Sequence, residues 1–113
     1  MIYIIDDDYK MAECIARYLR PEGTKIFTNA IAAIENIDDD APKLIFLDVL
    51  LDGPDGFTFL NELVSYETTA KIPVVIVTSL NLKTADLKAY GVRKILSKET
   101  LTPEEIKSCL SLI

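Results

Sequence analysis

Histidine is absent from this chain of 113 residues, and its absence excludes several kinds of chemistry. Without imidazole there is no Ser-His-Asp or Cys-His nucleophile system, no His-ligated zinc and no phosphohistidine on the chain itself. The only two cysteines, Cys14 and Cys109, are too few for an all-cysteine zinc site and too far apart for CxxC chemistry. We expect them to pack as small hydrophobic side chains, without a disulfide, in a reducing compartment.

Glycine, basic residues and long hydrophobic runs are also scarce. The four glycines form neither a P-loop nor a dinucleotide-binding pattern. No apolar run could span a bilayer and the N-terminus lacks the basic start of a secretory signal, so we expect a cytoplasmic protein without membrane contact. Acidic residues outnumber basic ones by 18 to 12, and the net charge is −6. This balance argues against direct nucleic-acid binding, because phosphate backbones are bound by dense Lys/Arg patches.

What remains is a globular composition with an alternating pattern. Half of the residues are hydrophobic, and the length suits one core. Short apolar runs rich in branched side chains predict strands at residues 2–5, 25–27, 43–48, 73–78 and 94–97. Helical patterns separate these runs, which predicts an α/β fold: a five-stranded parallel sheet with helices on both faces. No linker interrupts the pattern, so we expect a single domain over residues 1–113.

Helix starts are marked by capping residues. Asn29 and Asp55 are expected N-caps, and Thr102 begins a capping box with Glu105 around Pro103. A short helix is predicted over 82–89, ended by a glycine, and turn chemistry over 53–56. The side chains expected to face the core are Phe57, Leu60, Leu63 and Val64 in the third helix and Ile106, Cys109, Leu110 and Ile113 in the last.

Polar residues follow the strands at the points where the apolar runs stop. The first predicted strand ends in Asp6, Asp7 and Asp8, the third in Asp48, the fourth in Thr78-Ser79 and the fifth near Lys98. In open α/β sheets, ligands bind outside the carboxyl ends of the strands, where the strand order reverses. If the first and third strands are neighbours at that point, the carboxylates of residues 6, 7 and 48 converge.

Such a cluster has a recognisable chemistry. Clustered carboxylates resist ionising together, and a divalent cation relieves their repulsion; oxygen ligands of this kind suit Mg²⁺ or Mn²⁺. Lys98 and the Thr78 hydroxyl are suitable partners for phosphoryl oxygens. A carboxylate can attack phosphorus and form an acyl phosphate. The alternative for the acidic run alone is a helix N-cap, which we expect for Asp8.

In this order and at this spacing, these residues resemble the receiver domains of two-component response regulators. The family pattern is an acidic pair after the first strand, Asp after the third, Thr or Ser after the fourth and Lys after the fifth. Here these are Asp6-Asp7, Asp48, Thr78 and Lys98, and the family's Asp-Gly pair is present at residues 55–56. The resemblance covers the whole chain, and it implies a flavodoxin-like sheet of order 2-1-3-4-5.

The resemblance also implies a role for each acidic residue. Asp48 would accept a phosphoryl group from a phosphohistidine on a sensor histidine kinase or a histidine phosphotransfer protein. Asp7, Asp48 and the backbone carbonyl of Leu50 would hold Mg²⁺ or Mn²⁺ directly, and Asp6 would act through water. Such a domain is a signalling switch that catalyses only its own phosphoryl transfer and dephosphorylation, and is not a metabolic enzyme.

The remaining roles concern the phosphoryl oxygens. By the resemblance, Thr78 and the backbone N–H of Ser79 would bind these oxygens, and Lys98 would pair with the phosphoryl group. A basic strip at residues 83–98 carries five Lys or Arg residues against one acid. It lies in the 81–113 segment that serves many receivers as a partner or homodimer face, although a solvated face is an equally simple interpretation.

Three positions depart from the family pattern. Glu99 follows Lys98 where most receivers have proline, so we expect a trans bond there and a less firmly placed lysine. Ile95 replaces a switching aromatic residue, and Asp52 replaces a common proline. Glu99 and Ile95 favour the main alternative, a degenerate receiver that acts as a constitutive interaction module without phosphorylation, whereas the intact acidic residues, Thr78 and Lys98 disfavour it.

Two leucines bear on what happens after phosphorylation. Leu50 and Leu80 occupy the positions, two residues after the nucleophile and two after the threonine, that influence acyl phosphate hydrolysis in the family. Neither side chain can orient a water molecule, so slow self-dephosphorylation is expected. Leu50 also stands where a Mg²⁺-dependent phosphatase with an Asp nucleophile would need a second acidic residue, which places that third alternative last.

Overall fold

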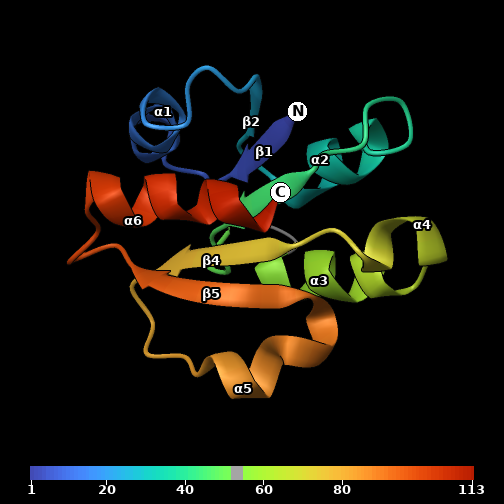
Figure 1. Cartoon of the computed structure of the whole chain (residues 1–113). Helices are drawn as coiled ribbons and strands as arrows, with labels where there is room; N and C mark the ends of the chain where they lie inside the picture. Colours follow the sequence, from blue (N-terminus) through green and yellow to red (C-terminus); the bar gives the residue numbers. More distant parts are fainter. Residues whose placement is uncertain (52–54) are drawn as a thin grey trace.

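The computed structural model describes residues 1–51 and 55–113; Asp52 and the predicted turn at Gly53-Pro54 lie outside the described residues. Five parallel strands form one sheet in the order β2-β1-β3-β4-β5 (Figure 1). The strands are β1 (Ile2–Ile5), β2 (Thr24–Phe27), β3 (Leu44–Leu47), β4 (Val74–Thr78) and β5 (Val92–Ser97). The α/β class and the order 2-1-3-4-5 are therefore confirmed, with β1 and β3 as neighbours in register from Ile2 and Leu44 onward.

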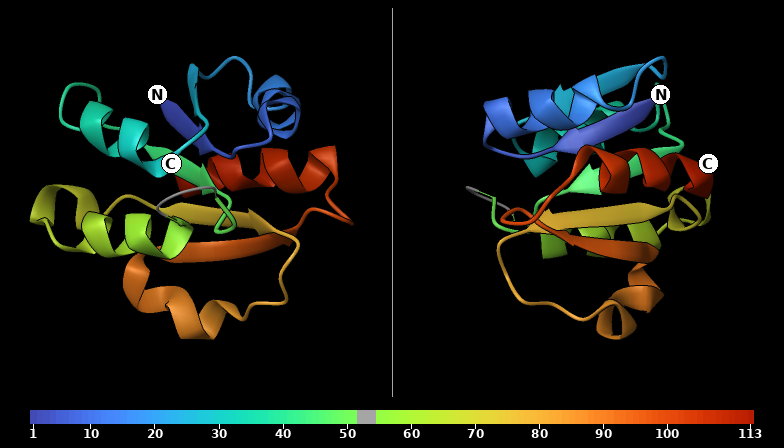
Figure 2. Two further views of the ribbon diagram at one scale, coloured as in Figure 1. Left: turned by 180° about the vertical axis from the view of Figure 1, so that it is seen from behind. Right: turned by 60° about the vertical axis from the view of Figure 1, so that its left-hand side comes forward.

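Helices cover both faces of the sheet (Figure 2). The helical elements are α1 (Tyr9–Arg17), α2 (Ala30–Asn36), α3 (Gly56–Val64), α4 (Glu67–Ala70), α5 (Thr84–Leu87), α6 (Pro103–Ser108) and the 3₁₀ turns η1 (Lys88–Tyr90) and η2 (Cys109–Leu112). In the described part of the chain, no helix is long and apolar enough to cross a membrane.

The core has two halves because the three central strands, β1, β3 and β4, are buried on both sides. One half packs Tyr3 and Ile5 of β1 against α2, α3 and α5; the other packs Ile2 and Ile4 against α1 and α6. Side chains alternate across a strand, so a doubly covered strand needs hydrophobic residues at every position. This explains the unbroken apolar runs in the sequence. Cys109 is buried and Cys14 partly buried, and both are free thiols as expected.

The expected helix caps are all present. Asp8 accepts hydrogen bonds from the backbone N–H of Lys10 and Met11 at the start of α1, Asn29 caps α2 and Asp55 caps α3. Thr102 forms the predicted capping box at the start of α6. Each side chain satisfies N–H groups that have no partner within the helix, so the sequence locates these helix starts well.

Several details of the packing differ from the predictions. Phe57 was expected to face the core but is 37% exposed, and Phe59 is buried in its place. Ile113 was also expected inside and is 49% exposed. The helix predicted over 82–89 is one α-helical turn followed by η1, and the short helix α4 was not predicted.

Gly56 explains how α3 approaches β3. A Cβ atom at Gly56 would lie 2.5 Å from the Cα atom of Val49 and 2.9 Å from the carbonyl oxygen of Asp48. We expect Gly56→Ala to lower the free energy of unfolding by about 1–3 kcal/mol, because backbone must move to admit the methyl group. Urea unfolding measures this. Gly23→Ala is the control, since its Cβ would meet only the Met1 side chain at 3.6 Å; equal stability of the two variants would contradict the prediction.

Candidate functional site

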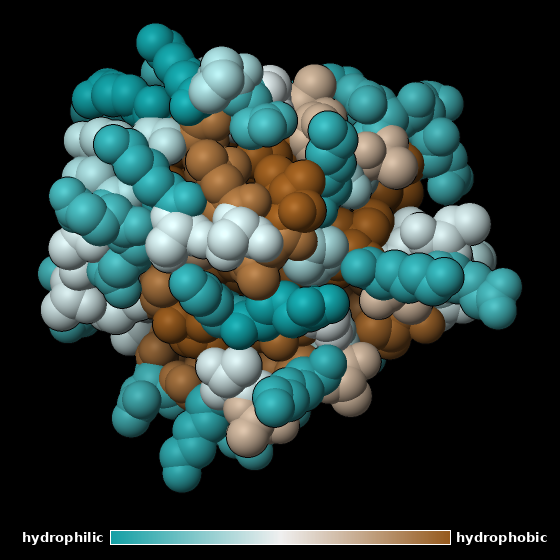
Figure 3. All heavy atoms as spheres, viewed as in Figure 1, coloured by the Kyte–Doolittle hydropathy of each residue, from teal (hydrophilic) through white to brown (hydrophobic). Residues whose placement is uncertain are grey.

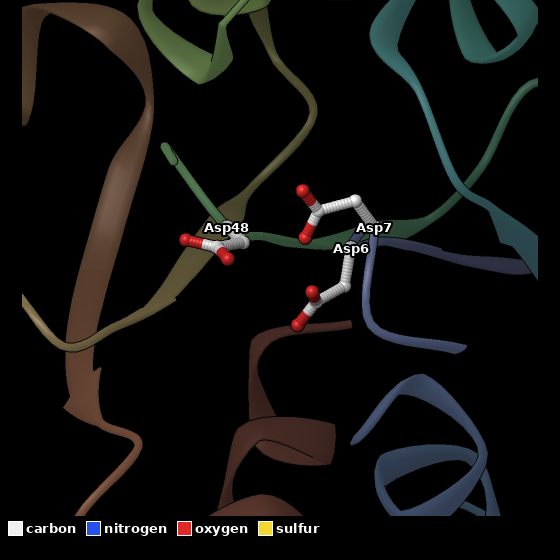
Figure 4. A group of neighbouring side chains, drawn as sticks. All are labelled: Asp6, Asp7 and Asp48. Atoms are coloured by element: carbon white, nitrogen blue, oxygen red, sulfur yellow. The ribbon is translucent and has the colours of Figure 1, made fainter. Parts of the chain in front are cut away.

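Three carboxylates meet at the carboxyl edge of the sheet. Asp6 and Asp7 follow β1, Asp48 follows β3, and the backbone N–H of Asp48 donates to the carbonyl of Ile5 at 2.9 Å. One carboxylate oxygen from each of the three residues lies within 4.8 Å of the others. Figure 4 shows the side chains of Asp6, Asp7 and Asp48 next to one another. Asp6 and Asp48 are buried, at 2% and 4% exposure, whereas Asp7 is exposed.

Backbone groups orient two of these carboxylates. The N–H of Asp8 donates to Oδ1 of Asp6 at 2.9 Å, and the N–H of Leu50 donates to Oδ1 of Asp48 at 3.0 Å. Each donor lies two residues beyond its acceptor, as in an Asx turn. These two backbone donors are not among the predicted site groups, although an Asp at the end of a strand is the signal that could have suggested them.

Lys98 reaches the acidic cluster from β5. Its Nζ atom donates to Oδ2 of Asp48 at 2.8 Å and lies 3.0 Å from Oδ2 of Asp6. Its backbone N–H also donates to the carbonyl of Thr78 at 3.0 Å. The Lys98–Glu99 bond is trans as expected, since Arg20–Pro21 is the one cis bond within the described ranges. Two ion contacts and one backbone hydrogen bond place Lys98 at the acidic cluster, and the less firm placement expected for it stays a prediction.

Thr78 ends β4 beside these groups. It is fully buried, and its Oγ1 accepts a hydrogen bond from the N–H of Leu80 at 3.2 Å. Ser79 follows it on the exposed surface. The side chains of Leu50 and Leu80 are 52% and 41% exposed on the loops that follow β3 and β4. Exposed apolar side chains thus follow both Asp48 and Thr78 by two residues.

Burial and charge oppose each other in this cluster. Desolvation raises the pKa of Asp6, and the hydrogen bond from Asp8 and the neighbouring Lys98 reduce that rise without cancelling it. Burial alone would lower the pKa of Lys98, but the hydrogen bond with Asp48 and the carboxylates of Asp48 and Asp6 outweigh it and raise the pKa. Lys98 is therefore a cation at neutral pH, and one cation faces three carboxyl groups.

The cluster fits a divalent cation. Oδ2 of Asp6 is buried and accepts no hydrogen bond within residues 1–51 and 55–113, because Lys98 approaches it without hydrogen-bond geometry. A buried carboxylate oxygen without such a donor is costly unless another positive group satisfies it. Carboxylate oxygens are the ligands that Mg²⁺ and Mn²⁺ prefer.

A pH dependence follows from the raised pKa of Asp6. The folded state binds this proton more tightly than the unfolded state, so its contribution to stability is present below the unfolded pKa and lost as pH rises through the folded pKa. Without divalent cation, we expect Asp6→Asn to be more stable than the parent at pH 7, with the difference shrinking toward pH 3.8. Thermal unfolding in a chelator across pH measures this, with Glu13→Gln as control. An Asp6→Asn variant that unfolds more easily at pH 7 would contradict it.

Comparison with known proteins identifies the family. The sequence profile of the response regulator receiver domain matches residues 2–111. The chain belongs to this family. Receiver domains are signalling domains of two-component systems, and those of response regulators are phosphorylated by histidine kinases. The expected resemblance is therefore confirmed.

Receiver domains of known structure share the fold. The receiver domain of NtrX from Brucella abortus superposes with a TM-score of 0.85 at 24% identity, covering 98% of this chain and 95% of that one. The Mn²⁺-bound form of the response regulator Rcp1 superposes with a TM-score of 0.80 at 21% identity, covering 97% and 91%. These likenesses show the fold.

Longer relatives contain a similar segment. The response regulator PleD of Caulobacter vibrioides is 33% identical over 82 residues, which is 71% of this chain and 18% of PleD. The probable transcriptional regulator ycf29 of Porphyra purpurea is 27% identical over 113 residues, 96% of this chain and 54% of ycf29. The receiver chain described here thus spans about a fifth of one relative and about half of the other.

Proposed function

We propose that this receiver accepts a phosphoryl group on Asp48 in a Mg²⁺-dependent reaction. The observation that carries the proposal is the contact of Lys98 with Asp48, next to the paired acids Asp6 and Asp7. A lysine held at 2.8 Å from the acceptor carboxylate supplies a positive charge where the negative charge of the incoming phosphoryl group would accumulate. The degenerate-receiver alternative is not favoured, because the acidic cluster and its lysine are intact.

The transfer itself needs little from the protein beyond position and charge. A carboxylate oxygen of Asp48 attacks phosphorus, the P–N bond to the donor histidine breaks, and the leaving imidazole keeps the electron pair and takes up a proton. The Lys98 ammonium would then move from the free carboxylate to a phosphoryl oxygen. The Thr78 hydroxyl and the Ser79 backbone N–H would donate to the other oxygens.

Asp7, Asp48 and the backbone carbonyl of Leu50 would hold the divalent cation directly, and Asp6 would act through water. When bound, Mg²⁺ or Mn²⁺ neutralises charge on the phosphoryl oxygens and on the carboxylates. The geometric support is the convergence of the three carboxyl groups and the unsatisfied Oδ2 of Asp6.

A histidine kinase or phosphotransfer protein would supply the phosphoryl group, since this chain has no histidine of its own. The acyl phosphate would shift an existing equilibrium between an inactive and an active state of the domain, which present different surfaces. The surface over residues 81–113 is the proposed homodimer or partner face, because it carries the basic strip.

The test is one added phosphate. We expect the purified chain, incubated with Mg²⁺ and acetyl phosphate, to gain the mass of a single phosphoryl group, and Asp48→Asn to gain none. Omitting Mg²⁺ should remove the gain in the parent chain. Asp39→Asn is the matched control, because it removes an exposed carboxylate outside the site and should be phosphorylated like the parent. A parent chain that stays unmodified, or an Asp48→Asn variant modified equally, would overturn the proposal.

A further inference from the structure

A cavity of about 230 Å³ opens at the pole of the domain opposite to Asp48. It lies between the C-terminal ends of α2 and α3, whereas the carboxylates lie at the carboxyl ends of the strands. We call it the α2–α3 cavity. Its lining includes Ile34, Ile37, Asp38, Glu62, Leu63 and Tyr66. Figure 3 shows hydrophobic atoms on the side of the molecule where Figure 1 places α2 and α4.

The cavity combines an apolar floor with an acidic, aromatic rim. Ile37 and Leu63 are buried at 7% and 3% exposure and form the floor. Asp38, Glu62 and Tyr66 are exposed at the rim, and the Tyr66 side chain is 59% exposed. Neither acid takes part in an ion pair among the residues that the structure describes. Two free carboxylates and one aromatic ring therefore border a hydrophobic hollow.

The backbone adds negative charge of its own. α2 and α3 both end at the cavity, and the C-terminus of a helix carries a partial negative charge that Lys or Arg in the last turn normally offsets. Neither helix has a basic residue in its last turn.

We infer that the α2–α3 cavity is a docking site for an arginine side chain of a partner protein, held between Asp38 and Glu62. A guanidinium group pairs with carboxylates through several donors and stacks on aromatic rings such as that of Tyr66. Hydrophobic neighbours of that arginine would cover Leu63 and Ile37. Buried arginines bordered by apolar contacts are frequent centres of protein interfaces.

The shape favours a side chain of a protein over a free small molecule. Small-molecule sites enclose most of their ligand, whereas the rim residues here are exposed to solvent. The site lies at the far end of the domain from the acidic cluster. It therefore offers a second surface, which a partner can use whether or not Asp48 is phosphorylated.

The probe is a blocked five-residue peptide with arginine between two leucines and alanine at each end. Its control has citrulline, the neutral isostere, in place of arginine. We expect the arginine peptide to shift backbone amide NMR signals of residues 34–38 and 62–69, and the citrulline peptide to bind at least tenfold more weakly. The double variant Asp38→Asn/Glu62→Gln should lose the binding. The double variant Glu13→Gln/Glu104→Gln, which removes the same charge from exposed positions on α1 and α6, should keep it.

Five results would overturn the inference. The first four are equal binding of the citrulline peptide, equal binding by the two double variants, no shifts with the arginine peptide at millimolar concentration, and binding of methylguanidine as tight as that of the peptide. The last would assign the cavity to a free cation. The fifth result is a set of NMR shifts that appears when the domain alone is concentrated. It would assign the cavity to a second copy of this chain and not to a partner protein. None of these outcomes depends on phosphorylation at Asp48.

Discussion

Replacing Lys98 with methionine is expected to slow phosphorylation of this receiver by acetyl phosphate by about 10²–10³-fold, because a positive group next to the reacting carboxylate is lost. The side chain of Lys98 is 17% exposed and contacts Asp48 and Asp6, whose side chains are 4% and 3% exposed. Stopped-flow or mass-resolved time courses in saturating Mg²⁺ measure the rate.

The same substitution should destabilise the domain without divalent cation. Removing the lysine leaves two buried carboxylates unpaired, which costs about 3–5 kcal/mol in the free energy of unfolding. Mg²⁺ should restore part of that loss, because it supplies a positive charge to the same carboxylates. Lys98→Arg is the second variant. It keeps the positive charge, so the protein should fold. Its planar guanidinium group does not reproduce the compact ammonium group of the lysine.

The control for both measurements is Lys94→Met. Lys94 lies on β5, the strand that Lys98 directly follows, but its ammonium donates to the hydroxyl of Ser108 at 3.1 Å and not to the acidic cluster. The Lys94→Met variant should be phosphorylated at the rate of the parent chain. Phosphorylation of Lys98→Met at the parent rate would show that the lysine does not act on the phosphoryl group.

A long-lived acyl phosphate is the second large effect that we expect. Hydrolysis requires a water molecule to attack phosphorus while the P–O bond to Asp48 breaks and inorganic phosphate leaves. The side chains of Leu50 and Leu80 lie on the adjoining loops, half exposed, and neither can accept a proton from that water. The double variant Leu50→Asn/Leu80→Glu should shorten the lifetime by about 10²-fold, since a positioned carboxylate base typically contributes this much.

Release of inorganic phosphate from the purified phosphorylated chain measures the lifetime. Leu50→Met/Leu80→Met is the matched control, because it changes the same positions while keeping them apolar, and its lifetime should equal that of the parent. If the polar variant kept the parent's lifetime, slow hydrolysis would have to come from something other than these leucines.

Most of the architecture was predictable because it depends on local patterns. Continuous apolar runs predicted strands buried on both faces, and caps such as Asp55 and Thr102 located helix starts. Packing within a helix was less predictable. Phe57 and Phe59 both fit helical spacing with Leu60 and Leu63, and the choice between them depends on the close approach of Gly56 to Val49, which only the folded chain shows. α4 escaped prediction because a single turn has no apolar period.

The candidate site was predictable for a different reason. Parallel strands bring their carboxyl ends to one edge, so polar residues after β1, β3 and β5 had to be near one another once the strand order was known. The sequence could not show how far Lys98 reaches. Lys98 contacts Asp48 and Asp6 although no proline follows it, so its position at the cluster does not require one.

The central claim is that the oxygen of one particular carboxyl group carries the phosphoryl group. Borohydride reduces an acyl phosphate of aspartate to homoserine, so treatment of the phosphorylated chain followed by peptide sequencing by mass spectrometry identifies the residue directly. The account predicts homoserine at position 48 and nowhere else, and none when Mg²⁺ is withheld. Homoserine at position 6 or 7 would contradict it. So would phosphate that remains on Ser79 or Thr78 after borohydride treatment, with no homoserine formed.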